Sequence, residues 1–248
     1  MADEGTTDDR TSPSGPEVAL KVEYPTVDAF LEDYSANLSK GGTMIRVDRQ
    51  LAVGEEVELH LSFPGLLTLI RLSGGVRWVE QDGADQQAGV EIHWASPAEA
   101  AALAALVDRI AKGEPAVVAP VIRVMVVEDN PHVARLLSDG LDVYRRRSTS
   151  PIAFLVRHAT NGKEALGMLA ETPADLLFVD MYLPVLDGET LIRTVRQDQG
   201  SREIPIIALS AGGEDARQGA VAAGADYFLE KPVRLAEVLT VMHRLIGS

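Results

Sequence analysis

Three carboxylates follow two apolar segments in the second half of the chain, at the point where each segment ends. Glu128 and Asp129 come directly after residues 121–127, and Asp180 ends residues 176–180. Three like charges at one place raise one another's pKa unless a cation neutralises them. Carboxylate oxygens suit Mg²⁺, which keeps open positions for water and for a phosphate. These residues therefore predict a magnesium site.

A hydroxyl and an ammonium group follow two further apolar segments. Ser210 comes after residues 204–209, and Lys231 comes after residues 227–230 and before Pro232. In phosphoryl transfer, Mg²⁺ and lysine offset the charge of the moving group, and a carboxylate can be the nucleophile. Each feature is weak evidence by itself. Together, at the ends of four segments, they predict phosphoryl-transfer chemistry.

Alternating strand and helix patterns must position these groups. The strand segments are nearly continuous apolar runs, which are typical of parallel strands covered on both faces. Strands are predicted at 121–127, 154–158, 176–180, 204–209 and 227–230, and helices near 131–146, 163–171, 188–198, 214–223 and 233–246. This order predicts a flavodoxin-like doubly wound α/β domain, in which ligands bind at the carboxyl ends of the strands.

Residues 121–248 resemble a response-regulator receiver domain, the phospho-acceptor part of a two-component system. The matching segments are Val126–Asn130, Leu177–Gly188, Ile206–Ala211 and Gly224–Pro232. The resemblance implies that a sensor histidine kinase or a phosphotransfer protein phosphorylates Asp180. It also implies that Glu128, Asp129 and Asp180 bind Mg²⁺, together with the backbone carbonyl of Tyr182.

The resemblance implies a switch as well. Ser210 would hydrogen-bond the phosphoryl group, Lys231 would pair with it, and Phe228 would turn inward when Ser210 moves. Phe228 fits equally well as an ordinary core aromatic. The face formed by residues 214–246 would then change its contacts with a second copy or with a downstream protein. One departure from the family is the longer segment Tyr144–Ile152, whose three arginines are interpreted as a solvated helix end or loop.

The first half of the chain has a different pattern. Short alternating segments at 18–24, 42–48, 56–63, 68–73, 75–80 and 87–94 predict a six-stranded antiparallel barrel or sandwich. A capping box at Ser96–Glu99 starts a closing helix, and Gly113 and Pro115 end it. The predicted organisation is a disordered acidic tail at 1–16, an all-β domain at 17–113, a linker at 114–120 and the α/β domain at 121–248.

The first domain resembles a PilZ domain, a small β-barrel that in many cases binds cyclic di-GMP. The Asn-x-Ser-x-x-Gly part of the binding signature is present as Asn37, Ser39 and Gly42, although a structural turn explains it fully. The paired arginines of the signature are missing, because Arg10 is alone and too far upstream. Since guanine recognition needs guanidinium groups, cyclic di-GMP binding is not expected.

Composition excludes several classes of protein. The 248 residues contain no cysteine, so disulfides and thiolate chemistry are absent. The net charge is −14, and residues 1–115 hold 20 Asp and Glu against 9 Lys and Arg, which argues against DNA binding. No signal sequence or membrane-spanning run is evident, so a cytoplasmic protein is expected. The five histidines have no metal-ligand spacing.

The sequence thus predicts a response regulator that is not an enzyme and has no DNA-binding output. Its output would act through the PilZ-like domain or a partner, in motility, attachment or development. Three alternatives remain open: a cyclic di-GMP effector coupled to a receiver, a scaffold whose receiver is never phosphorylated, and an aspartate-nucleophile phosphatase. Phosphatases of the haloacid dehalogenase type carry a second aspartate two residues after the nucleophile, and here that position is Tyr182.

Overall fold

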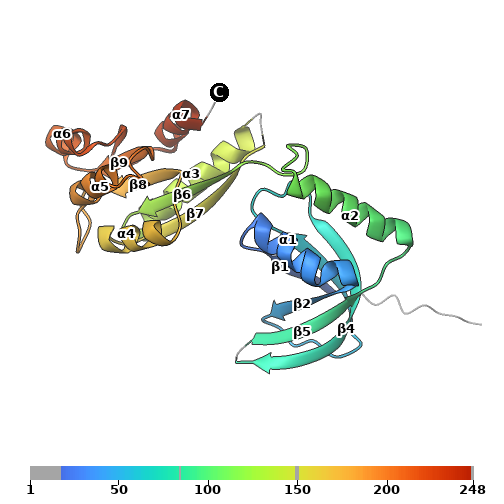
Figure 1. Ribbon diagram of the computed structural model, residues 1–248. Helices are drawn as coiled ribbons and strands as arrows, with labels where there is room; N and C mark the ends of the chain where they lie inside the picture. The colour runs from blue at the N-terminus through green and yellow to red at the C-terminus, as the bar shows by residue number, and fades with distance from the viewer. Residues whose placement is uncertain (1–17, 84, 149–150, 247–248) are drawn as a thin grey trace, which may run out of the picture. The chain divides into compact units, whose positions relative to one another are not determined.

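The chain is described by a computed structural model that covers residues 18–83, 85–148 and 151–246. It divides into two compact units, residues 1–114 and 115–248, each built on a five-stranded sheet (Figure 1). The boundary between the units falls within the predicted linker 114–120. The predicted tail at 1–16 lies outside the described residues.

The second unit alternates strands and helices along the chain. The strands are β6 (Val121–Val127), β7 (Ala153–Ala159), β8 (Leu176–Asp180), β9 (Ile206–Ser210) and β10 (Tyr227–Glu230). The helices are α3 (Pro131–Arg147), α4 (Gly162–Glu171), α5 (Gly188–Gln197), α6 (Gly213–Ala223) and α7 (Leu235–Ile246). All strand pairs are parallel, in the order β10-β9-β8-β6-β7. This is the flavodoxin-like order, and the predicted fold class is confirmed.

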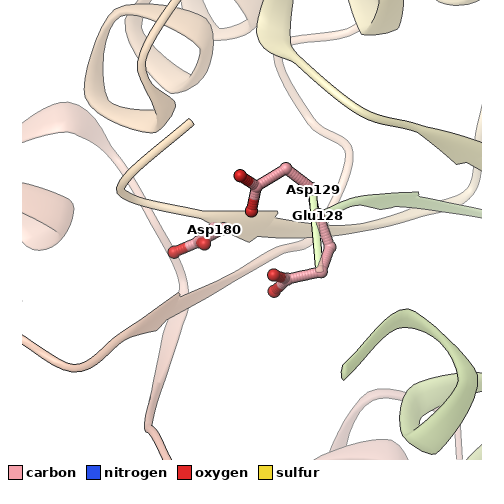
Figure 2. A group of neighbouring side chains, drawn as sticks. All are labelled: Glu128, Asp129 and Asp180. Atoms are coloured by element: carbon pink, nitrogen blue, oxygen red, sulfur yellow. The ribbon is translucent and has the colours of Figure 1, made fainter. Parts of the chain in front are cut away.

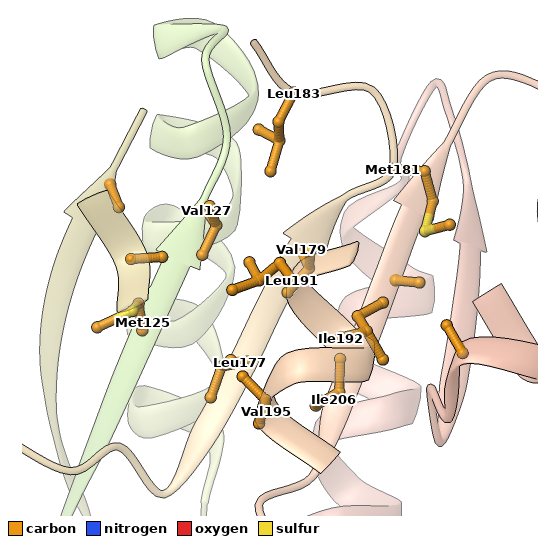
Figure 3. Close-up of a cluster of buried hydrophobic side chains, with 14 of the residues drawn as sticks. Met125, Val127, Leu177, Val179, Met181, Leu183, Leu191, Ile192, Val195 and Ile206 are labelled. Carbon is orange, nitrogen blue, oxygen red and sulfur yellow. The ribbon is translucent and has the colours of Figure 1, made fainter. Parts of the chain in front are cut away.

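Helices cover both faces of this sheet because successive strand residues point in opposite directions. Met125 and Val127 face a core with α4, α5 and α6, part of which is drawn in Figure 3. Val124 and Val126 face a second core with α3 and α7. These four side chains are at most 1% exposed, which explains the uninterrupted apolar pattern of β6. The sheet therefore lies between two apolar cores, and the polar residues that follow its strands gather at its carboxyl edge.

The first unit contains one sheet, with the strand order β1-β3-β4-β5-β2. Its elements are β1 (Val18–Glu23), α1 (Val27–Ala36), the short 3₁₀ helix η1 (Leu38–Lys40), β2 (Gly42–Val47), β3 (Glu56–Ser62), β4 (Ile70–Asp82), β5 (Asp85–Ile92) and α2 (Pro97–Ala111). β1 pairs in parallel with β3, and the other pairs are antiparallel. As predicted, Ser96 caps α2 by accepting a hydrogen bond from the Glu99 amide.

The predicted number of strands in this unit is wrong. The predicted segments 68–73 and 75–80 are joined in one long strand, β4, which begins at Ile70, so the sheet has five strands and not six. Gly74 does not break the strand but allows the close approach of β5. A Cβ atom at Gly74 would lie 2.5 Å from the Glu91 carbonyl oxygen and 2.8 Å from a Val90 methyl group. The glycine pair thus marks close packing between strands and not the end of a strand.

The helix α1 was not predicted. It begins after Thr26, whose side-chain oxygen accepts a hydrogen bond from the Ala29 amide at 3.1 Å. Phe30 is fully buried and packs against Tyr24 and Phe63, with ring centroids 5.4 Å and 5.3 Å away. Only this one residue of α1 is buried, so the helical periodicity of its apolar residues is weak.

Candidate functional site

Glu128, Asp129 and Asp180 gather at the carboxyl edge of the second sheet (Figure 2). Their strands, β6 and β8, are neighbours, so residues far apart in sequence meet there. One carboxylate oxygen of each residue lies within 4.8 Å of the others. Within the described part of the chain, this is the only group of three or more acidic, histidine or cysteine side chains placed to hold a metal ion. All-oxygen ligands at this spacing fit Mg²⁺.

Burial differs among the three carboxylates. Glu128 is fully buried and Asp180 is 4% exposed, whereas Asp129 is exposed. Burial raises the pKa of Glu128, and the nearby charge of Asp180 raises it further, while the hydrogen bond from Lys231 opposes both. Buried like charges are costly without a cation. The site therefore favours any cation that reaches it.

Lys231 is the cation that the chain itself supplies. Its Nζ atom lies 2.7 Å from Asp180 Oδ2 and 2.8 Å from Glu128 Oε2. Burial lowers the pKa of Lys231, but the hydrogen bonds to Asp180 and Glu128 outweigh burial and the net pKa is raised. Lys231 follows β10, and its backbone amide donates to the Ser210 carbonyl at 2.8 Å. The sequence placed Lys231 at this edge, but its contact with Glu128 was not predicted.

Two loops close around Asp180 from β8 and β9. The amide of Tyr182 donates a hydrogen bond to Asp180 Oδ1 at 3.2 Å. Ser210 is fully buried, and its Oγ atom accepts a hydrogen bond from the Gly212 amide at 3.0 Å. The structure thus brings Ser210 and the Tyr182 backbone to the same edge as the carboxylates. The use of the Tyr182 carbonyl as a metal ligand stays a prediction.

Phe228 is half-buried on β10 and packs against the core that α4, α5 and α6 cover. It also lines a hollow with residues of α6 and α7. The role of Phe228 as a switch stays a prediction, because the observed position of its ring fits both a switch residue and an ordinary core aromatic. The arginines 145–147 are exposed in the last turn of α3, where positive charge complements the helix carbonyls.

The first unit has a hollow of about 610 Å³ on its sheet. Its lining includes Asn37 and Gly42 of the predicted motif, but Ser39 is not among the lining residues. The Asn37 amide group donates to Asp33 Oδ1 at 2.7 Å, and the Ser39 hydroxyl donates to the Ser35 carbonyl at 3.3 Å. Both polar side chains of the motif therefore bond to α1, which agrees with a structural turn.

Other residues of this hollow were not predicted. Arg77, Trp78 and Met44 line it together with Glu91. The register of β4 against β5 shifts between Val76 and Trp78, and such bulges re-aim side chains. Arg77 forms an ion pair and a hydrogen bond with Glu91. No sequence signal identifies these contacts, because they depend on strand register.

Comparison with known proteins identifies both units. A model of the response regulator receiver domain matches residues 124–243, and a model of the PilZ domain matches residues 9–109. Response regulator MprA of Mycobacterium bovis is 35% identical over 126 residues, which are 50% of this chain and 50% of that protein. The transcriptional regulator RpaA of Synechocystis is 29% identical over 126 residues, 50% of this chain and 48% of that protein.

Similarity extends to a histidine kinase and to solved structures. Sensor histidine kinase TmoS of Ectopseudomonas mendocina is 34% identical over 126 residues, 50% of this chain and 12% of that protein. A solved receiver domain of the sensor histidine kinase PA1611 from Pseudomonas aeruginosa has 30% identity and a TM-score of 0.45, and the match covers 51% of this chain and 98% of that one. The chain spans about half the length of the regulators it matches.

None of the helices within residues 18–83, 85–148 and 151–246 has the length and apolar character needed to cross a bilayer.

The domain matches and the sheet order agree on the organisation of the chain. The chain consists of a PilZ domain followed by a response regulator receiver domain.

Proposed function

We propose that the chain is a response regulator of a two-component system, which accepts a phosphoryl group on Asp180 and signals through protein contacts. One observation carries the proposal. The nearly buried carboxylate of Asp180 lies 2.7 Å from Lys231 Nζ, at the edge where Glu128 and Asp129 also gather. A carboxylate that pairs with a cation, on a strand next to one that ends in a hydroxyl, suits phosphoryl transfer.

The proposed reaction uses the residues in distinct roles. A carboxylate oxygen of Asp180 attacks the phosphorus atom of a phosphohistidine, the phosphorus–nitrogen bond breaks, and an acyl phosphate forms on Asp180. Lys231 offsets the negative charge of the transferred group, and the Ser210 hydroxyl donates a hydrogen bond to it. Glu128, Asp129 and Asp180 would hold Mg²⁺, which neutralises the phosphoryl oxygens when it is bound.

The remaining parts of the proposal concern partners and place. The phosphodonor is a sensor histidine kinase or phosphotransfer protein, and the chain is a signalling protein and not an enzyme. The output passes through the PilZ domain, a target protein or a second copy on the face of residues 214–246, without DNA binding. A cytoplasmic location and a process such as motility, attachment or development fit these roles.

The test is phosphate uptake from a small phosphodonor, phosphoramidate, in the presence of Mg²⁺. We expect one phosphoryl group per wild-type chain and none in Asp180→Asn, measured by intact-protein mass spectrometry. Asp142→Asn is the matched control, because Asp142 is an exposed aspartate on α3 away from the site. Equal uptake by Asp180→Asn and wild type would contradict the assignment, and steady release of phosphate from a phosphomonoester would favour the phosphatase alternative.

A second candidate function is cyclic di-GMP binding by the PilZ domain. The family match and the hollow that contains Asn37, Lys40 and Trp78 favour it. Arg77 already pairs with Glu91, so a nucleotide would have to share or replace that ion pair. We expect isothermal titration of the whole chain with cyclic di-GMP to give no saturable heat. Saturation at micromolar concentration would instead make the chain a sensor of both phosphate and nucleotide.

A further inference from the structure

His158 lies near the end of β7, beside the turn that carries Glu128 and Asp129. Strand residues alternate between the two faces of a sheet, and the preceding residues on the face of His158 are Phe154 and Val156. Both pack against the core that α3 and α7 cover. At position 158 the same face carries an exposed histidine in place of a third apolar residue. The apolar pattern of β7 therefore ends in an imidazole next to the candidate metal site.

The imidazole of His158 forms a hydrogen bond with the main chain of this turn. Its Nε2 atom lies 2.7 Å from the carbonyl oxygen of Glu128. A carbonyl oxygen only accepts hydrogen bonds, so Nε2 must carry a proton and act as the donor. The amide of Glu128 in turn donates to the carbonyl of Ala159 at 3.0 Å. Two consecutive residues of β7 thus hold both polar groups of the Glu128 backbone.

These two bonds orient the peptide group that joins Glu128 to Asp129, which follow one another in the turn (Figure 2). Because a peptide group is planar, the direction of the Glu128 carbonyl sets the direction in which the chain enters Asp129. The side chain of Glu128 is held separately, since its Oε1 atom accepts a hydrogen bond from the Asn130 amide at 3.2 Å. The bond from His158 therefore affects the placement of Asp129 more than that of the Glu128 carboxylate.

Asp129 is the carboxylate of the site whose placement depends most on the backbone. Glu128 is fully buried, Asp180 is 4% exposed, and both pair with Lys231. Asp129 is instead exposed to solvent. An exposed side chain has more conformations to lose than a buried one when a metal ion binds. Holding the backbone of Asp129 in place reduces that loss, as any preorganisation of a binding site does.

We propose that His158 is a positioning residue of the magnesium site, whose hydrogen bond to the Glu128 carbonyl holds Asp129 where it can bind the ion. The proposal rests on the metal-binding role of Glu128, Asp129 and Asp180 within the proposed function. Groups that orient metal ligands change metal affinity by about 10-fold to 100-fold. Because His158 acts on a backbone oxygen and not on a ligand atom, we expect a smaller effect of about threefold to tenfold.

The experiment measures the binding of Mn²⁺ to the full chain, with free Mn²⁺ counted by electron paramagnetic resonance and Mg²⁺ added as a competitor. His158→Phe keeps a ring without the donor, and its dissociation constant should rise by about threefold to tenfold. His158→Gln places an amide nitrogen near the position of Nε2 and should retain wild-type binding. His243→Phe is the matched control, because His243 is an exposed histidine on α7 of the same unit. Asp129→Asn identifies the ion bound at the site.

Phosphate uptake from phosphoramidate provides a second readout. The Mg²⁺ concentration that gives half of the maximal uptake rate should rise in His158→Phe by the same factor as the Mn²⁺ dissociation constant. The uptake rate at saturating Mg²⁺ should stay at the wild-type value, since the bond acts on the binding of the ion. A general loss of structure would instead lower the rate at every Mg²⁺ concentration. Thermal unfolding with a chelator present verifies that the compared chains are folded.

The outcomes distinguish this proposal from the proposed function. Equal Mn²⁺ affinity in wild type and His158→Phe would overturn the role of His158, and so would equal weakening in His158→Gln or in His243→Phe. A wild-type chain that binds no Mn²⁺, or that binds it equally well after Asp129→Asn, would overturn the metal site on which the role depends. A wild-type chain that binds Mn²⁺ through Asp129 but takes up no phosphate would overturn the proposed function and leave the role of His158 in place.

Discussion

The polar side chains of the two units differ in their burial and in the partners that they have within the fold. In the receiver, Glu128 and Asp180 are buried carboxylates that share a single lysine. In the PilZ domain, Asn37 bonds to Asp33 of the neighbouring helix, and Arg77 in the same hollow pairs with Glu91. The receiver site thus holds like charges that an added cation would stabilise, whereas the polar groups of the PilZ motif are already satisfied by the fold.

This difference teaches how to weigh the two motifs. Both were recognised as short patterns of polar residues, and both domains were correctly identified from them. Buried, mutually repelling charges point to a function, because a fold does not gain stability from them. Polar groups that cap and bridge neighbouring elements point to structure. The contacts therefore support chemistry at Asp180 more strongly than at Asn37.

The largest effect should follow removal of the shared cation. Lys231→Met leaves Glu128 and Asp180 without their counter-ion, which costs several kcal/mol when both groups are fully buried. Since Lys231 is 19% exposed and Glu128 can take up a proton, we expect a loss of about 2 kcal/mol in the free energy of unfolding. Urea unfolding without metal measures this loss, and excess Mg²⁺ should restore part of it.

The matched control is Lys163→Met, which removes an exposed lysine from α4 of the same unit. It should change the free energy of unfolding by no more than a few tenths of a kcal/mol, roughly the usual range for surface positions. If the two lysine variants lost equal stability, the receiver site would not differ from an ordinary surface, and the contrast with the PilZ domain would be lost.

An intermediate effect is expected at Tyr24 in the PilZ domain. Its hydroxyl donates to Asp33 Oδ2 at 2.6 Å, and Asp33 also accepts from Thr43 at 3.0 Å. Tyr24→Phe removes one of these bonds and should cost about 1 kcal/mol. Because Asp33 also holds Asn37, the variant tests whether the motif is part of a structural network.

The same tyrosine predicts a dependence on pH. Burial raises the pKa of Tyr24, and the hydrogen bond to Asp33 raises it further. A raised pKa means that the folded state retains a proton that the unfolded state loses above about pH 10. Stability from Tyr24 is therefore complete below about pH 10 and decreases as the pH rises toward the folded-state pKa. Wild type should lose more stability than Tyr24→Phe between neutral and alkaline pH, and parallel curves would contradict the network.

The sequence and the structure agree best where local pattern decides the structure. Strands β8 and β10 have the predicted bounds, because buried parallel strands are uninterrupted apolar runs with polar residues at their ends. Helix α1 and the continuity of β4 through Gly74 were not foreseen, because both depend on packing partners distant in sequence. The close approach of the Tyr182 hydroxyl to Gly212 could not be predicted for the same reason, because the β8–α5 and β9–α6 loops meet only in the folded domain.

The smallest effect compares two aspartates that flank one strand. Asp175 precedes β8 and binds Arg123 through both carboxylate oxygens, at 2.7 Å and 2.9 Å, but both side chains are 38% exposed. The hydrogen bond from Arg123 lowers the pKa of Asp175. Asp175→Asn should cost only about 0.5 kcal/mol, because solvent screens an exposed pair. A cost as large as that of Lys231→Met would show that burial does not distinguish the two ends of β8.

The lowered pKa of Asp175 determines whether the stability from its pair with Arg123 rises or falls with pH. A lowered pKa means that the pair stabilises the fold above the unfolded-state pKa of about 4, and that this contribution is lost as the pH falls through the lower folded-state pKa. Unfolding by urea should therefore separate wild type from Asp175→Asn near neutral pH, and the curves should converge in acid. Asp180, at the other end of β8, lies instead beside two further carboxylates and the Lys231 ammonium group, and replacing it with asparagine should abolish phosphate uptake. Differences in burial and in neighbouring charge would then explain why Asp175 stabilises the fold and Asp180 is reactive.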